Sequence, residues 1–198
     1  MSIYRKVQAV EKVFKALEKE LASFKNGTGL NCLSGCGLCC LNPNITATPL
    51  EFLPFAYELH KNGLAYQWLE DVQSSETSTC KILRPMLSEG ETGFCSQYQY
   101  RGLICRLFGF AASRNKMSQL ELATCKTIKA EFPEQYQTAK DLIKDGGKVP
   151  IMTDFYHQLR AIDTELGRQL MPINDAIEEA LKVVLSYYAY RKPYRRRA

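Results

Sequence analysis

The sequence predicts a mainly α-helical protein, a single helical domain built around an irregular, cysteine-rich metal-binding centre. Three observations lead to this fold class. Apolar residues recur at helical spacing toward both ends of the chain. Eight cysteines gather between residues 32 and 125, in segments rich in glycine. The length of 198 residues suits one compact domain better than two full ones.

The composition is that of a globular protein. Hydrophobic residues make up 45% of the chain and charged residues 24%. No apolar run approaches the roughly 18 residues of a membrane-spanning helix. The N-terminal segment mixes charges into its apolar residues, unlike a signal peptide, so we expect a protein of the reducing cytoplasm.

The N-terminal region, residues 1–26, is expected to form an amphipathic helix over residues 2–25. Its apolar residues alternate at spacings of four and three, which places them on one stripe: Ile3, Val7, Val10, Phe14, Leu17, Leu21 and Phe24. Asn26-Gly27 then predicts the end of the helix. The stripe favours packing on the chain's own core, and a coiled-coil partner is the alternative.

The cysteine-rich region, residues 27–130, has little long-range periodicity. Thr48-Pro49-Leu50-Glu51 is a capping-box start for a helix running to about residue 60. A short second helix is expected over residues 64–72. Short strands or a hairpin are expected near residues 94–110.

The C-terminal region, residues 131–190, is predicted to be helical again. Pro133 opens a helix that Gly146-Gly147 closes. Two further apolar stripes predict helices over residues 151–170 and 175–190, which we expect to form an antiparallel pair.

The net charge of +5 comes from the basic tail, residues 191–198. Its sequence RKPYRRRA holds five basic residues and no acidic one, and the rest of the chain has 21 basic and 21 acidic residues. A neutral body argues against one broad nucleic-acid-binding face. The tail combines aromatic and basic residues, as segments that bind single-stranded nucleic acid or an anionic membrane do. A solvated terminus is the favoured interpretation.

The eight cysteines predict a metal site. Four lie within nine positions, and the others follow along the chain: Cys32, Cys36, Cys39, Cys40, Cys80, Cys95, Cys105 and Cys125. The spacing of Cys36 and Cys39 lets one turn bring two sulfurs to one metal, and thiolates favour zinc, copper(I) or iron–sulfur clusters. Inert buried thiols and a disulfide framework are the alternatives. Both are disfavoured, because the cysteines cluster and no secretory segment precedes them.

Several motifs follow one another in a fixed order. The run C-x-x-x-C-x-x-C-C from Cys32 is followed by T-P-x-E from Thr48, C-K-I-L from Cys80, and G-F-C-S-Q-Y-Q-Y-R-G-L-I-C-R-L-F from Gly93. This order resembles the CxxCxxCC family of zinc- or iron-chelating domains, cysteine-cluster proteins of the YkgJ type, over roughly residues 30–110. The chain departs from the pattern in the three-residue first gap and in Gly102, where the family typically has proline. A similarity of the family to the cysteine-cluster region of flagellin lysine methylases favours an iron–sulfur cluster over zinc.

Adjacent Cys39 and Cys40 cannot easily both reach one small ion, so we expect them to serve different metals or different irons of one cluster, or to be one ligand and one bystander. The expected principal site is Cys36, one of this adjacent pair, Cys95 and Cys105, enough thiolates for a [4Fe–4S] cluster or a closed zinc site. The weaker candidates complete a second site with the other member of the pair: Cys32, Cys80 and Cys125.

Three side chains near Cys105 are expected to support the site. Arg101 and Arg106 flank Cys105 and can stabilise a negatively charged cluster. Tyr98 is expected to pack beside it. His60 and His157 lie on predicted helices far from the cysteines in sequence, and a structural role is favoured for both.

The sequence favours a cytoplasmic metal-binding protein that holds an iron–sulfur cluster in a structural or electron-transfer role. No Ser/His/Asp set, phosphate-binding glycine loop or paired-carboxylate motif assigns a catalytic residue, which leaves enzymatic activity open. The alternative is a zinc-stapled module that binds a protein or nucleic-acid partner. The electron-transfer partner is not identified by any motif.

Overall fold

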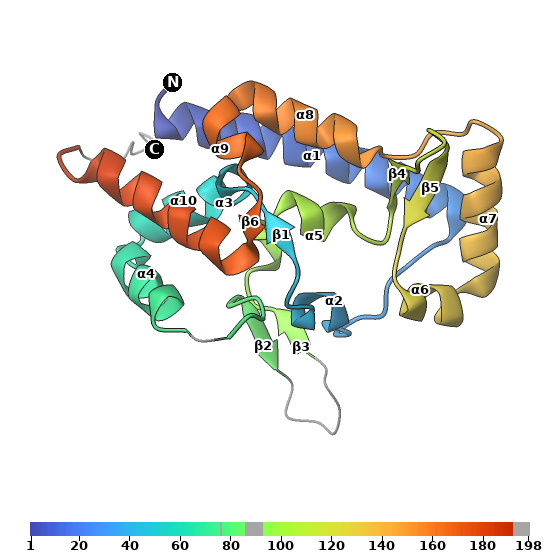
Figure 1. Cartoon of the computed structure of the whole chain (residues 1–198), viewed down its shortest axis with the longest axis horizontal. Coiled ribbons are helices and arrows are strands. Elements are labelled where there is room, and N and C mark those ends of the chain that lie inside the picture. The colour runs from blue at the N-terminus through green and yellow to red at the C-terminus, as the bar shows by residue number, and fades with distance from the viewer. Residues whose placement is uncertain (76, 86–92, 192–198) are drawn as a thin grey trace.

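The computed structural model describes residues 1–75, 77–85 and 93–191 and confirms the mainly α-helical fold class (Figure 1). The ten α-helices of this part of the chain are α1 (Ile3–Thr28), α2 (Leu38–Leu41), α3 (Pro49–Lys61), α4 (Ala65–Gln73), α5 (Leu103–Leu107), α6 (Lys126–Glu131), α7 (Pro133–Lys144), α8 (Met152–Ile162), α9 (Thr164–Arg168) and α10 (Ile173–Tyr188). The basic tail beyond Arg191 lies outside the described residues. No described helix is long and apolar enough to cross a membrane.

The described residues form three short antiparallel strand pairs. Two are hairpins, β2 (Leu83–Pro85) with β3 (Gly93–Cys95) and β4 (Ala111–Arg114) with β5 (Leu120–Ala123), and the third, β1 (Thr46–Ala47) with β6 (Met171–Pro172), joins distant parts of the chain. The strands expected near residues 94–110 are therefore only partly correct. Only β3 falls at the start of that range, and a 3₁₀ turn (Tyr98–Tyr100) and α5 occupy the rest.

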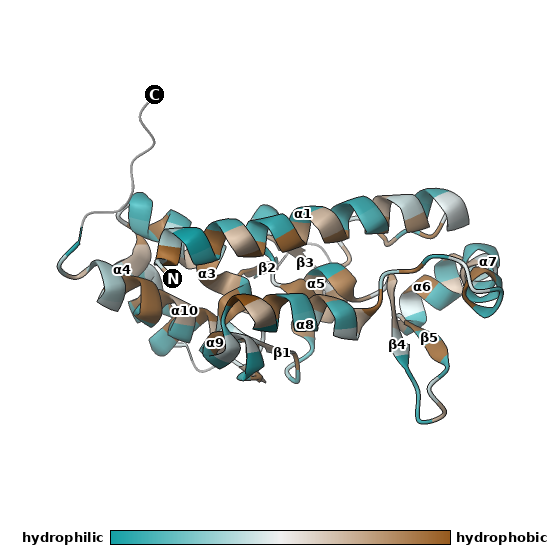
Figure 2. Ribbon diagram, turned by 90° about the horizontal axis from the view of Figure 1, so that it is seen from above, coloured by the Kyte–Doolittle hydropathy of each residue, from teal (hydrophilic) through white to brown (hydrophobic). Residues whose placement is uncertain are grey.

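Helix α1 runs along one long side of the molecule (Figure 2). All seven residues of its predicted stripe are buried, and they face α3, α7 and α8. The stripe therefore packs on the chain's own core, as expected. The helix ends later than Asn26-Gly27, because the left-handed capping position is Gly29, with φ of 69°.

The predicted helix over residues 151–170 is broken at Asp163. The Asp163 side chain accepts hydrogen bonds from the backbone N–H groups of Glu165 and Leu166, which caps α9, and it pairs with Lys6. The chain then crosses to the other side of the core through β6. Helix α8 consequently packs on α1, whereas α10 packs on α3 and α4, so the expected antiparallel pair is replaced by two separate packings.

Glu51 joins α3 to α5 through a completely buried carboxylate. Its Oε1 accepts a hydrogen bond from the backbone N–H of Thr48 (2.8 Å), as the predicted capping box requires, and a second from the Thr48 hydroxyl (3.0 Å). Its Oε2 accepts a third from the backbone N–H of Ile104, at 3.1 Å. Burial raises the pKa of Glu51 despite these donors. The T-P-x-E motif therefore both starts α3 and fixes the short helix that carries Cys105.

Replacing this carboxylate tests its role. Glu51→Ala is expected to lower the free energy of unfolding by about 2–4 kcal/mol, because it leaves buried N–H donors without acceptors. The measurement is urea denaturation followed by circular dichroism. The matched control is Glu58→Ala on the same helix, which removes a partly exposed carboxylate that pairs with Lys61 and accepts from the Asn62 side chain, and it is expected to cost less than about 1 kcal/mol. Equal losses in the two variants would show that Glu51 is an ordinary helix residue.

Candidate metal centre

Five of the eight cysteines line one small pocket of about 80 Å³. They come from four separate segments, since α2 supplies two, the turn before β2 one, β3 one and α5 one: Cys39, Cys40, Cys80, Cys95 and Cys105. A backbone hydrogen bond from Cys80 N–H to Cys40 O, at 3.3 Å, joins two of these segments directly. We call these five residues the thiol pocket.

The rest of the thiol pocket is mostly apolar. Phe52, Ile82, Leu83 and Ile173 line it together with Gly102, Tyr98 and Arg101. Among the described residues that line the pocket there is no histidine and no carboxylate, so sulfur is the donor that they offer. Such a donor set fits a soft metal ion or an iron–sulfur cluster and not calcium or magnesium.

The other three cysteines do not line the thiol pocket: Cys32, Cys36 and Cys125. Burial raises the pKa of Cys32, and the charges of Cys36, Cys125 and Cys39 raise it further. The Cys125 sulfur accepts a hydrogen bond from the backbone N–H of Ile128 at 3.4 Å and so caps α6.

This placement differs from the expected grouping. Cys80, which we assigned to a second site, lies with Cys95 and Cys105, while Cys36 does not line the pocket. The reason is local, because Gly37 takes a left-handed conformation (φ of 60°) and starts α2, turning Cys39 and Cys40 away from the segment before it. Nothing in the spacing of Cys80 indicates its position, which follows from the long-range contact with Cys40.

The thiols of the pocket influence one another's ionisation. A hydrogen bond from the Cys40 thiol lowers the pKa of Cys39 to about 6, and the same hydrogen bond raises the pKa of Cys40. Burial raises the pKa of Cys80 to about 11. Burial also raises the pKa values of Cys95 and Cys105. The pocket therefore favours one thiolate among protonated neighbours until a cation replaces the protons.

Arg101 and Arg106 have different surroundings. Arg101 lines the thiol pocket, stacks over the exposed ring of Tyr98 at 3.9 Å, and opposes the raised pKa of Cys95. Its buried Nε has no hydrogen-bond partner among the described residues. Arg106 is 4% exposed and donates to the carbonyl oxygens of Gln99 (2.6 Å) and Arg101 (3.0 Å) while pairing with Glu18 of α1. Arg101 thus faces the sulfurs, and Arg106 holds the loop that precedes α5.

Close backbone contacts at glycines position the cysteine turn. A Cβ atom on Gly37 would lie 2.4 Å from the carbonyl oxygen of Gly93 in β3. A Cβ atom on Gly102 would lie 2.9 Å from Cζ of Phe52 and 3.0 Å from Oε2 of Glu51. Gly102 is therefore tightly packed, and the turn before Cys105 is not loosened by the absence of a proline.

None of the eight cysteines, all of which are described, forms a disulfide. Among the described residues, no three Cys, His, Asp or Glu side chains already stand in positions that would hold a metal ion. His60 stacks on Tyr188 at 4.8 Å and His157 is exposed on α8, and neither lines the thiol pocket.

The sequence profile of the CxxCxxCC family, described as "Putative zinc- or iron-chelating domain", matches residues 31–132, just over half of the chain. The chain belongs to this family. The match contains all eight cysteines. No curated protein sequence and no solved structure matches the chain.

The contact between Gly37 and Gly93 gives a test of how the cysteine turn is held. Gly37→Ala is expected to reduce stability by about 2–4 kcal/mol, since it adds a left-handed alanine and an overlap with backbone. It should also reduce bound metal, measured by elemental analysis of the purified protein. The matched control is Gly27→Ala, whose added Cβ meets nothing within 4 Å inside α1. The control is expected to bind metal normally, and a normal metal content in Gly37→Ala would show that this contact does not matter.

Proposed function

We propose that the thiol pocket binds an iron–sulfur cluster through four thiolates, and that the protein is a cytoplasmic metal-binding protein with a structural or electron-transfer role. The observation that carries the proposal is the convergence of five thiols from four chain segments on one apolar pocket. When bound, the cluster supplies reversible electron transfer. The chain supplies the thiolates, a surrounding of low polarity and a fixed positive charge.

A [4Fe–4S] cluster and a closed zinc site each take four thiolates, and either needs only one of adjacent Cys39 and Cys40. The similarity of the family to the cysteine-cluster region of flagellin lysine methylases favours the cluster. The separate irons of a cluster can accept sulfurs that approach from different segments, as those of Cys80, Cys95 and Cys105 do. A [4Fe–4S] cluster then takes these three thiolates together with Cys39 or Cys40.

Arg101 supports the same proposal. A cluster with four thiolates carries net negative charge, and the apolar pocket stabilises that charge poorly. The Arg101 guanidinium lies at the pocket, and its buried Nε has no partner among the described residues. Hydrogen bonding from this group to sulfur would satisfy the donor and stabilise the cluster.

Metal analysis of protein purified without oxygen tests the proposal. The expected result is a brown protein with about four irons and about four acid-labile sulfides per chain. A colourless protein with stoichiometric zinc would support the zinc-stapled interaction module in its place. A protein that lacks metal and holds four disulfides would contradict both functions.

Single cysteine variants test which thiols bind the cluster. Cys80→Ser, Cys95→Ser and Cys105→Ser are each expected to remove most of the iron, because each withdraws a pocket thiolate. Cys125→Ser is the matched control, since Cys125 lies outside the thiol pocket, and most of the iron should remain. The measurement is the iron-to-protein ratio together with the visible absorption spectrum. Equal losses in all four variants would contradict the assignment of ligands.

Deletion of the basic tail provides a further check. Removing residues 191–198 is expected to leave the metal content unchanged, because neither Arg191 nor the end of α10 lines the thiol pocket. The deletion variant and the full chain can be compared by the same iron assay. A loss of iron would show that the tail helps to hold the site.

A further inference from the structure

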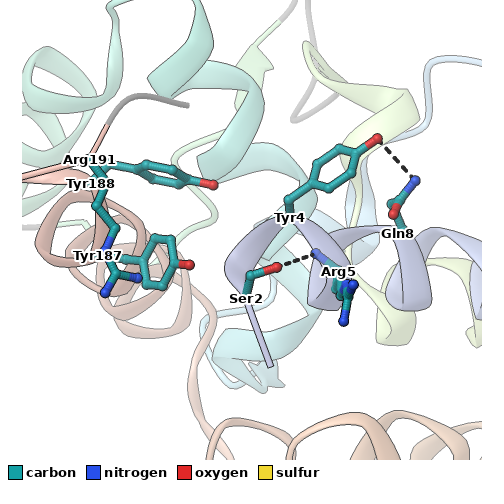
Figure 3. Close-up of a pocket in the computed structure, with 7 residues that line it drawn as sticks. All are labelled: Ser2, Tyr4, Arg5, Gln8, Tyr187, Tyr188 and Arg191. Carbon is teal, nitrogen blue, oxygen red and sulfur yellow. Dashed lines mark hydrogen bonds between the residues drawn. The ribbon is translucent and has the colours of Figure 1, made fainter. Parts of the chain in front are cut away.

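A second and larger pocket lies where α1 begins and α10 ends, far from the thiol pocket in the fold (Figure 1). Its volume is about 460 Å³, within the range of pockets that hold small organic ligands. Figure 3 shows Tyr187 and Tyr188 on one side and Tyr4, Arg5 and Gln8 on the other. All of these residues lie outside the segment that matches the family. We call this site the terminal pocket.

The aromatic wall of the terminal pocket is held in place by other rings. Tyr187 and Tyr188 meet edge to face with centroids 4.8 Å apart. Tyr188 is 8% exposed and stacks on His60 with an interplanar angle of 16°. Its other neighbour is Tyr57, at 5.9 Å. Because packing fixes Tyr188, and Tyr187 packs on it, the wall offers planar surfaces with little conformational freedom left to lose on binding.

The charge of the terminal pocket is positive. Arg5 and Arg191 line it, and no Asp or Glu does. Among the described residues neither arginine forms an ion pair, whereas neighbouring Lys6 is paired with Asp163. The partial positive charge at the α1 N-terminus and the partial negative charge at the α10 C-terminus oppose each other here. The two arginines therefore determine the sign of the net charge at the pocket.

The position of Arg191 extends this charge along the chain. Arg191 lies over the Tyr187 ring at 4.7 Å, which places a cation beside an aromatic face. In sequence it opens the tail RKPYRRRA, which adds four more basic residues. A ligand with a planar ring and flanking phosphates matches the tyrosine rings and the two arginines of the terminal pocket.

We propose that the terminal pocket binds single-stranded nucleic acid, with one base against the Tyr187 and Tyr4 rings and the flanking phosphates on Arg5 and Arg191. Bases of any identity stack on tyrosine, and guanidinium groups bind phosphate oxygens in a bidentate manner. Gln8, whose amide donates to the Tyr4 hydroxyl at 3.1 Å, holds that ring at the mouth of the pocket. A planar aromatic wall suits a base better than the acyl chains of a lipid.

Binding of a labelled RNA by the full, metal-loaded chain tests this proposal. The probe is a fluorescein-labelled, single-stranded RNA of about twelve nucleotides, titrated by fluorescence anisotropy. Tyr187→Ala is expected to raise Kd at least about fivefold, which corresponds to about 1 kcal/mol of lost stacking. Tyr187→Phe keeps the ring and is expected to restore binding.

The arginines give a separate readout. Arg5→Gln and Arg191→Gln are each expected to weaken binding severalfold and to lower the slope of log Kd against log salt concentration by about 0.7, the contribution of one phosphate contact to a single strand. The matched control is Arg114→Gln in the β4–β5 hairpin, at the far side of the fold, which should bind as the parent does. Iron content should be unchanged in all variants, which separates a failure here from a failure of the metal site. The melting temperature should also be unchanged, except in Tyr187→Ala, which loses the packing of Tyr187 on Tyr188.

Three results would overturn the proposal. If the tyrosine and arginine variants bound the RNA with the same Kd as the unchanged protein, all of the binding would come from the tail. A Kd for uridine monophosphate equal to that for the RNA would show a site for free nucleotides. Binding to vesicles that contain an anionic phospholipid, without binding to the RNA, would show a membrane surface.

Discussion

The buried Glu51 carboxylate is the interaction on which the arrangement of the cysteine centre depends. It accepts hydrogen bonds from the start of α3 and from the first turn of α5, two segments that are about fifty residues apart in sequence. A carboxylate with no contact to water is costly unless donors surround it, so each donor must be in place when the chain folds. Cys105 follows Ile104 directly, and its position is therefore set by the same hydrogen bonds.

The charge of the thiol pocket limits how many of its cysteines can be thiolates at once. Five neighbouring thiols cannot all ionise in an apolar pocket, and the raised pKa values of four of them, Cys40, Cys80, Cys95 and Cys105, express that cost. A metal supplies the missing positive charge, so binding and proton release are coupled. Arg101 adds a fixed cation at the pocket, while Arg106 is fully used in holding the preceding loop to α1. Arg101 and Arg106 look equivalent in sequence but have different roles. Arg101 contributes positive charge at the pocket, and Arg106 holds the preceding loop in place.

The two pockets lie in different parts of one fold. The thiol pocket is built from α2, α5 and the β2–β3 pair, whereas the terminal pocket is built from the outer ends of α1 and α10. Helix α3 packs against both α1 and α10 and also supplies Glu51. The same helix therefore supports both sites, although no residue lines both pockets.

The sequence by itself determined the helical class, the buried stripe of α1, the start of α3 and the family, because periodicity, capping and ordered motifs are local properties of the chain. The β4–β5 hairpin and the break at Asp163 were missed, since tertiary pairing overrides weak local preference. Which thiols share a pocket was decided only by the tertiary structure. The left-handed turn at Gly37 and the Cys80–Cys40 hydrogen bond place Cys80, and not Cys36, beside Cys95 and Cys105. The physical reason is that the spacing of cysteines restricts the relative positions only of thiols that are close together in sequence. Thiols that are far apart in sequence are brought together by the packing of the backbone segments that carry them.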